Sequence, residues 1–349
     1  MADKILLRAY KGQAKSVNLS NRNLPSVPNL IGKLSKVKSI DLKNNKICSL
    51  PKDFSVITQL ENLNLGNNIL EELPAELGHL VNLKKLHLFA NHIIILSSFV
   101  LSALQHLTFL NLNDNKLTSL PPEIERLVSL QFLSANKNRL QSIPDEICHL
   151  THLTELHLAD NFLESLPENI GFLKNLTRLI LYKNRLTELP QGLSKCCKLE
   201  YLDVSCNFIK YFPVNFYALP LRELYCEGNN LLKHLPLHSE QVEEVLSLKE
   251  LTARFVMKKN RDKRSHIRVQ LRECPEIKDM LSFAGDCALC GESFLNTWLE
   301  CVSFIDCKKG LGTRNSPGIV PIRGQLCSYK CFNSEGHDYF GIAQVDGGQ

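Results

Sequence analysis

The sequence predicts an α/β solenoid, a curved stack of similar turns with a parallel sheet on its concave side. The pattern LxxLxLxxNxL recurs along the chain, as in LENLNLGNNIL at 60–70 and LTRLILYKNRL at 176–186. Its asparagine returns every 23 residues, with one spacing of 24 and one of 22, and an earlier copy carries Arg22 in that position. A second half such as LPPEIERLVSL, at 120–130, joins successive copies. The asparagines are Asn45, Asn68, Asn91, Asn115, Asn138, Asn161, Asn184, Asn207 and Asn229.

Each part of the repeat has a physical role. The LxL segment is expected to form a short strand whose leucines point into the stack, and ten strands would build the parallel sheet. The asparagine amide can satisfy backbone groups of neighbouring turns that would otherwise be buried unpaired. A Leu-Pro or Ile-Pro step, as at Pro144 and Pro190, fixes φ where the chain turns to the convex side.

These 23-residue units resemble the intracellular leucine-rich repeats of Ras-suppressor and Shoc2-like scaffold proteins. The resemblance implies a horseshoe that binds proteins and implies no catalysis. The copy at 91–114 departs from the pattern, because it lacks the proline and holds one extra residue. We expect a local distortion there.

Three segments follow from the repeat and the cysteines: a ten-repeat solenoid at 1–238, a helical segment at 239–283 and a cysteine-rich module at 284–349. The chain has 349 residues and a net charge of +5. It shows no secretory signal and no apolar run long enough to cross a bilayer, so a monomer without membrane contact is expected in the cytoplasm, with the nucleus as the alternative. The basic stretch at 257–272 has no interleaved aromatic residues, which favours a solvated helix face over nucleic-acid binding.

The residues that flank the strand leucines should face solvent on the concave side. They are small or polar in the first three repeats, and bulky from the fourth onward. Clustered exposed aromatics are typical of protein-binding anchors, although they can also be tolerated by a crowded sheet or covered by a terminal segment. The predicted client-binding residues are His87, Phe89, Phe109, Phe132, His157, Ile180, Tyr182, Tyr201 and Tyr225.

The tail contains two cysteine pairs, a CxxC step at Cys287 and Cys290 and a CxxxC step at Cys327 and Cys331. Two such turns supply four thiolates, the closed tetrahedral set of a structural zinc, in a small module that depends on metal to fold. The alternative for CxxC is thiol redox chemistry, but no βαβ frame surrounds it. Flanking segments at 294–307 and 318–327 are expected to pair as strands. Cys301 and Cys307 are expected to be ordinary thiols, and His337 is a reserve ligand.

A helix is expected over 239–257, with Ser239 as a plausible N-cap. One interpretation is a cap that covers the last repeat. The other rests on a resemblance to the elongin-binding box of ubiquitin-ligase substrate receptors, in which Ser247, Leu248, Thr252 and Val256 match one helical face. Thr252 departs from the small residue expected there. The segment CPEIKDML at 274–281 is similar to the cullin-selecting box of such receptors.

Over the whole chain, the repeats together with SLKELTARFVM, CALCGESFLNTWLECVSF and LCSYKCF resemble a leucine-rich repeat family with a cysteine-paired tail, whose relatives include receptors of cullin–RING ligases. The resemblance implies a non-enzymatic adaptor that holds a protein client and binds elongin and a cullin. A signalling scaffold without a ligase link is the alternative. No phosphate loop, nucleophile elbow or metalloprotease helix occurs to suggest an enzyme.

Overall fold

The computed structural model describes residues 2–232, 246–262, 265–282, 284–296, 298–314, 318–334 and 336–341. These residues form two compact units. The first comprises Met1–Ile209, Tyr217–Asn230 and Cys307–Pro317, and the second comprises Lys210–Phe216, Leu231–Asp306 and Gly318–Gln349. No helix in the described ranges is both long enough and apolar enough to cross a membrane.

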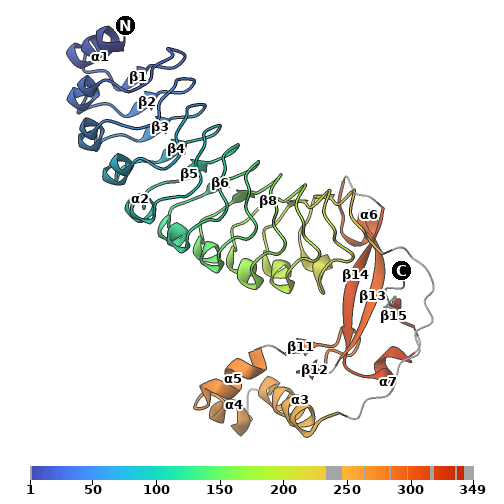
Figure 1. The fold of residues 1–349 in the computed structure, drawn as a ribbon. Coiled ribbons are helices and arrows are strands. Elements are labelled where there is room, and N and C mark those ends of the chain that lie inside the picture. Colours follow the sequence, from blue (N-terminus) through green and yellow to red (C-terminus); the bar gives the residue numbers. More distant parts are fainter. Residues whose placement is uncertain are drawn as a thin grey trace. The chain divides into compact units, whose positions relative to one another are not determined.

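The first unit is built on one parallel sheet of ten strands, which lie in sequence order (Figure 1). The predicted solenoid is therefore confirmed. In every strand the central residue is buried, whereas the first residue is at least partly exposed. The strands are β1 (Ser16–Asn18), β2 (Ser39–Asp41), β3 (Asn62–Asn64), β4 (Lys85–His87), β5 (Phe109–Asn111), β6 (Phe132–Ser134), β7 (Glu155–His157), β8 (Arg178–Ile180), β9 (Tyr201–Asp203) and β10 (Glu223–Tyr225).

Short helices occupy the other side of this stack (Figure 1). In seven turns a 3₁₀ helix follows a proline whose backbone is extended. Six of these prolines belong to the predicted Leu-Pro and Ile-Pro steps, and Pro28 takes the same position after a valine. The 3₁₀ helices are η1 (Asn29–Lys33), η2 (Lys52–Val56), η3 (Ala75–His79), η4 (Pro122–Arg126), η5 (Asp145–His149), η6 (Glu168–Phe172), η7 (Gln191–Lys195) and η8 (Phe216–Ala218).

The irregular repeat has the expected distortion. Its turn is the α-helix α2 (Ser98–Ala103), which begins after Ser97 where the other repeats have proline. An α-helix holds more residues per turn than a 3₁₀ helix, so it accommodates the extra residue. The exposed Phe99 ring of this helix packs edge-on against His79 of the preceding repeat, with ring centroids 6.1 Å apart.

Both ends of the repeat stack carry added segments. At the first repeat, helix α1 (Ala2–Lys11) buries Ala2 and Leu6. At the last repeat, the segment that begins with α6 (Cys307–Gly310) buries Leu311 and Thr313. The amide of Arg314 then donates a hydrogen bond of 2.8 Å to the Arg222 carbonyl. Sequence reasoning placed residues 307–314 in the cysteine module, yet they belong to the repeat unit.

The regular spacing of the asparagines corresponds to a ladder of buried amides. Asn138 is representative: its Nδ2 donates to the carbonyls of Leu112 (3.0 Å) and Ala135 (3.1 Å), and its Oδ1 accepts from the Leu117 amide (3.0 Å). Each asparagine thus joins its own turn to the preceding one, as predicted. The residue before each asparagine is left-handed, with φ of 51–58° at Asn44, Asn67, Ala90, Asp114, Lys137, Asp160, Lys183 and Cys206, and 70° at Gly228.

The second unit combines helices with a small antiparallel sheet. Strand β13 lies between β14 and β15, and β11 pairs with β12. Phe212 extends the sheet by exchanging backbone hydrogen bonds with Pro321 (2.9 Å) and Arg323 (2.8 Å) on β14. The elements are α3 (Leu248–Arg261), α4 (His266–Gln270), α5 (Pro275–Ser282), β11 (Gly285–Asp286), β12 (Ser293–Phe294), β13 (Leu299–Asp306), β14 (Ile319–Leu326), α7 (Tyr329–Phe332) and β15 (Tyr339–Gly341).

The predicted helix over 239–257 differs at both ends from α3. Ser247 is its N-cap and accepts a hydrogen bond of 3.2 Å from the Glu250 amide, and the helix continues to Arg261. The earlier candidate cap Ser239, like the boundary predicted at 238, lies outside the described residues. The predicted pairing of the segments at 294–307 and 318–327 is present as β13 and β14.

Replacement of Asn138 by alanine should destabilise the repeat unit by about 3 kcal/mol, because buried carbonyl and amide groups lose their partner. Urea denaturation should measure the loss, and hydrogen exchange at the Leu117 amide should become faster. The matched control is Asn82→Ala, which removes one exposed hydrogen bond to Thr58 and should cost less than about 1 kcal/mol. Equal effects of the two changes would contradict the ladder's role.

Candidate functional site

The concave face consists of the first and third residues of β1–β10, which flank the buried central residue of each strand. The parallel register places these residues in two rows that cross the sheet. Neighbouring strands in any sheet lie about 4.8 Å apart, so large side chains that are adjacent in a row can touch. The chemistry of this face is therefore decided by residues that the core leaves unconstrained.

Four rings form a continuous stack across β4–β7. The Phe109 and Phe132 rings are parallel, with an interplanar angle of 3° and centroids 4.4 Å apart. His87 lies 4.8 Å from Phe109 on one side, and His157 lies 4.9 Å from Phe132 on the other. All four side chains are partly exposed, so a partner can reach the aromatic stack from solvent.

A second aromatic group lies on β9 and β10. Tyr201 and Tyr225 have centroids 5.4 Å apart, and the Arg178 guanidinium lies 4.2 Å above the Tyr201 ring. Between the two groups, Glu155 accepts a hydrogen bond of 3.1 Å from His157, and Ile180 pairs in register with His157. The predicted stripe is thus interrupted by charged residues, which sequence reasoning passed over.

The signal for Glu155 and Arg178 was present in the sequence. Both occupy the same strand-flanking position as Phe109 and Phe132. A search restricted to bulky apolar residues could not find them. They give the middle of the face a polar, charged character.

Phe89 and Tyr182 lie just beyond the strands, in the turns that follow β4 and β8. The Phe89 ring occupies the space that a side chain at Gly66 would fill, since a Cβ built there would clash with the ring. Phe89 is partly exposed, and Tyr182 is 37% exposed. These two residues line the edge of the concave face.

Burial lowers the pKa of both histidines in the aromatic stack. For His87 the nearby Lys85 adds to the effect, whereas for His157 the carboxylate of Glu155 opposes it. Both imidazoles are therefore neutral at pH 7 and act as aromatic contact surfaces. Among the residues that the structure describes, neither histidine belongs to a group that could hold a metal ion.

The four predicted zinc ligands come together in the second unit. The sulfur atoms of Cys287, Cys290, Cys327 and Cys331 lie within 4.8 Å of one another. The Sγ of Cys327 is 3.6 Å from the Sγ of Cys290 and 3.6 Å from that of Cys331. A disulfide needs about 2.05 Å, whereas ligands about 2.3 Å from a tetrahedral zinc lie about 3.8 Å apart. The spacing fits a closed four-thiolate site.

Backbone amides stabilise the thiolate form of Cys287, the first residue of the CxxC pair. Amides of Leu289, Cys290 and Cys327 donate to the Cys287 sulfur and outweigh its burial, so the pKa of Cys287 falls to about 7. Gly291 follows with a φ of 70°, which a glycine adopts without strain. Burial instead raises the pKa of Cys327 and of Cys331, so a cation would be needed to hold all four as thiolates.

The other expected thiols and the reserve ligand lie outside this cysteine centre. Cys301 and Cys307 are buried, and burial raises the pKa of Cys301 to about 12. Both ring nitrogens of His337 are engaged, Nε2 with the Phe332 carbonyl at 2.6 Å and Nδ1 with the Tyr339 amide at 3.1 Å. His337 is thus a structural residue.

Helix α3 is fastened to both cysteine turns. Glu250 is fully buried, and its carboxylate accepts from the amides of Leu295 (3.0 Å) and Asn296 (2.6 Å) and from Arg254 (2.6 Å). Arg254 also donates to the Cys327 carbonyl at 2.9 Å, and Arg261 donates to the Gly291 carbonyl at 2.6 Å. Sequence reasoning did not identify this clamp.

The residues of the elongin-type box lie on the part of α3 that the clamp does not use. Leu248 is 80% exposed, Thr252 is exposed and Val256 is partly buried. Leu251 and Phe255 are also exposed, so the helix presents an apolar face. The segment resembling a cullin-selecting box forms α5, whose Met280 and Leu281 pack against Ala253, Met257 and Leu295.

Comparisons with known proteins agree with the repeat architecture. A model described as "Leucine-rich repeat region" matches residues 96–184, and one described as "Leucine Rich repeats (2 copies)" matches residues 174–216. The chain is 55% identical to leucine-rich repeat-containing protein 69 of Xenopus laevis over 343 residues, which cover 98% of this chain and 99% of the relative. The protein of the same name from Homo sapiens is 42% identical over 125 residues, 36% of each chain.

Two solved structures share the repeat fold. A leucine-rich repeat protein of Leptospira interrogans is 33% identical, with a TM-score of 0.58 over 66% of this chain and 65% of the other. The ectodomain of the Arabidopsis thaliana receptor kinase GASSHO1/SCHENGEN3, solved in complex with CASPARIAN STRIP INTEGRITY FACTOR 2, is 32% identical. Its TM-score is 0.56 over 62% of this chain and 27% of that one.

Elemental analysis of the purified chain should find about one zinc per chain. Chelation should melt the second unit, including α3, while the repeat unit keeps its hydrogen-exchange protection. Cys290→Ser should lose the metal, whereas Cys274→Ser, an exposed thiol outside the centre, should retain it. A metal-free chain with a fully folded second unit would contradict the assignment.

Replacement of Glu250 by glutamine should destabilise the second unit by about 3 kcal/mol, because a buried hydrogen-bonded charge is lost. The hydrogen bonds from Arg254 and from the backbone outweigh burial and lower the pKa of Glu250. Its contribution is therefore complete above the ordinary carboxyl pKa of about 4.3 and is lost as the pH falls through the lower folded value.

Thermal denaturation between pH 7 and pH 3 should show this dependence in the wild type and a weaker one in the glutamine variant. The control is Glu292→Gln, whose partner Lys258 is largely exposed, and it should change little. A wild-type profile that matches the Glu250→Gln profile would rule out the carboxylate as the source.

Proposed function

Because this chain belongs to the leucine-rich repeat-containing protein 69 family, we propose that it is a protein-binding adaptor that holds a polypeptide client on the concave face. Leucine-rich repeat proteins typically mediate protein–protein interaction. The single observation that carries the proposal is the aromatic stack of His87, Phe109, Phe132 and His157. Burial of such rings contributes more free energy to an interface than most other contacts.

The chemistry of the concave face suggests what the client presents. The aromatic stack offers flat apolar surfaces to aliphatic or aromatic side chains. Glu155 and Arg178 beside it offer one acceptor and one donor group, and Tyr201 and Tyr225 continue the apolar surface. A client segment with apolar anchors about three strand spacings apart, separated by polar groups, fits this order. The similar Arabidopsis ectodomain, which was solved with a bound factor, supports the use of this fold for protein ligands.

A finer function is suggested by the exposed face of α3. In this second candidate, Leu248 and the residues one and two turns later dock into a groove of elongin, and the chain delivers its client to a cullin ubiquitin ligase. The Thr252 hydroxyl donates to the Leu248 carbonyl at 2.7 Å. This bond satisfies the hydroxyl within the helix, so the departure from a small residue costs little polar desolvation.

The competing reading is a signalling scaffold of the Shoc2 or Ras-suppressor type. Such a scaffold uses the same concave face but needs no ligase component. The two readings therefore share the client-binding proposal and differ only in the role of α3. Zinc has a structural role in both.

Affinity capture followed by mass spectrometry should test the concave face. A triple variant, Phe109→Asp, Phe132→Asp and Tyr182→Asp, should lose at least tenfold of client recovery, because charges replace the apolar anchors. The matched control changes Val56, Val81 and Val128, which are exposed apolar residues outside the strands, to aspartate and should keep the client.

Unchanged capture by the folded triple variant would refute the assignment of the client surface. The same experiment separates the two finer readings. Elongins and a cullin should be recovered with the wild type and lost with Leu248→Arg if the ligase reading holds. Client recovery without any elongin would favour the scaffold.

A further inference from the structure

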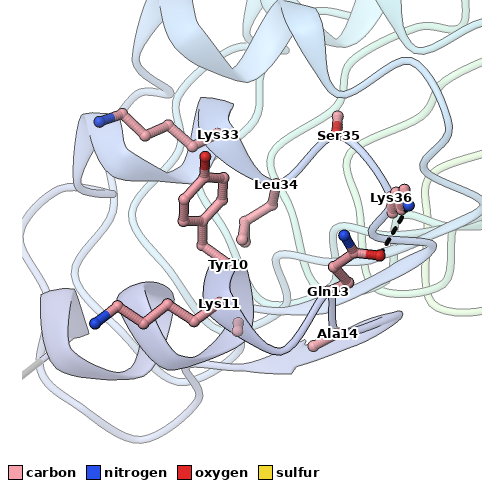
Figure 2. Close-up of a pocket in the computed structure, with 9 residues that line it drawn as sticks. Tyr10, Lys11, Gln13, Ala14, Lys33, Leu34, Ser35 and Lys36 are labelled. Carbon is pink, nitrogen blue, oxygen red and sulfur yellow. Dashed lines mark hydrogen bonds between the residues drawn. The ribbon is translucent and has the colours of Figure 1, made fainter.

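The first unit contains a hollow of about 280 Å³ at its N-terminal end, between the end of α1 and the end of η1 (Figure 2). Its polar lining consists of Tyr10, Lys11, Gln13, Lys33, Ser35 and Lys36, and the remaining lining residues are apolar. Figure 2 shows the Tyr10 ring between the side chains of Lys11 and Lys33. The concave face does not include any of these residues.

The hollow exists because α1 replaces a repeat. Along the stack, a residue in one turn contacts its counterpart 23 positions away, as when Lys198 donates to Asn175 at 2.7 Å. Lys36 and Gln13 repeat this contact at 2.8 Å. On the N-terminal side of the first repeat, helix α1 stands where a further turn would be. The hollow lies beside it, next to the buried Leu34.

The lining has a strong charge imbalance. It holds three lysines and no carboxylate. Among the described residues, Lys11 and Lys33 form no ion pair, in contrast to Lys38 and Lys84, which both bind Glu61. The surrounding sequence is basic as well, because residues 1–60 contain eleven lysines and arginines against three aspartates, a net charge of +8. Since the whole chain carries +5, the remaining residues carry −3.

We propose that this hollow binds a phosphorylated serine or threonine side chain of a protein partner. A phosphate monoester carries a charge of about −1.5 to −2 at pH 7 and three strong acceptor oxygens. The ammonium groups of Lys11 and Lys33, which extend on either side of the Tyr10 ring, supply the opposite charge, and the Tyr10 hydroxyl is a further donor (Figure 2). Lys36 donates instead to Gln13 and adds to the positive charge of the surroundings.

The openness of the hollow favours a side chain over a free metabolite. Pockets that bind small ligands bury most of the ligand surface, whereas every polar residue that lines this hollow is exposed. A phosphoryl group on a polypeptide needs little enclosure, because the flanking backbone lies along the surface. The basic surroundings also accelerate the approach of an acidic segment.

The test is a titration of the full chain with the labelled peptide Gly-Gly-phosphoSer-Gly-Gly and with its unphosphorylated form. Nuclear magnetic resonance should show saturable shifts at residues 9–14 and 33–36 with the phosphorylated peptide alone. The double variant Lys11→Glu, Lys33→Glu should weaken this binding at least tenfold. Lys4→Glu, an exposed change on α1 outside the hollow, should weaken it less than threefold.

Three results would overturn the proposal. They are shifts that do not depend on the phosphate, equal binding by the double variant and Lys4→Glu, and saturable binding of phosphoinositide vesicles or single-stranded RNA without any binding of the phosphopeptide. Circular dichroism should show that both variants remain folded. Because the concave face is unchanged in these variants, client capture through the aromatic stack should persist, and failure of one site does not imply failure of the other.

Discussion

The asparagine ladder is the interaction on which the repeat unit depends. Each amide joins two successive turns, and it makes these bonds where the chain leaves the sheet in a left-handed conformation. That conformation costs most residues about 1–2 kcal/mol and costs glycine, asparagine and aspartate less. Eight residues other than glycine adopt it before the asparagines, and four of them are asparagine or aspartate. The hydrogen bonds of the asparagine amides offset this strain, because they pair backbone carbonyls that would otherwise be buried without a partner. The period of about 23 residues is therefore the chain length that places one asparagine amide in each turn, where it can bond to the preceding turn.

A rigid ladder leaves the concave face free to vary. The central residue of every strand is fixed by the core, whereas most flanking residues are partly exposed and contact side chains of neighbouring strands in either row. Register then decides contact, so that Phe109 and Phe132 stack because they are opposite each other on strands at the ordinary spacing. The same rule places a glutamate and an arginine next to these rings. Binding chemistry can thus change without any change in folding.

The sequence predicts the features that follow from regular local spacing. It does not predict features that depend on contacts between residues far apart in the chain. The ten strands, the proline turns and the four-cysteine centre follow from local spacing, which the structure preserves. Glu250 looks like an ordinary helix residue, and its burial arises from amides 45 and 46 positions away. Residues 307–314 belong with the last repeat through the burial of Leu311 and Thr313 and a backbone hydrogen bond to Arg222, and no pattern in the segment signals it.

The contacts of Glu250, Arg254 and Arg261 tie helix α3 to the cysteine centre of the second unit. One arginine of the helix binds the carbonyl of Cys327 and another binds the carbonyl of Gly291, so the helix spans the turns of both cysteine pairs. Anything that separates the pairs must break these bonds and expose the buried Glu250 carboxylate. A metal that holds the four sulfurs together would therefore also hold α3 in place, with Leu248 directed to solvent. Leu248, Leu251 and Phe255 stay exposed on this helix, and their exposure is the observation that supports the proposal of α3 as a binding element.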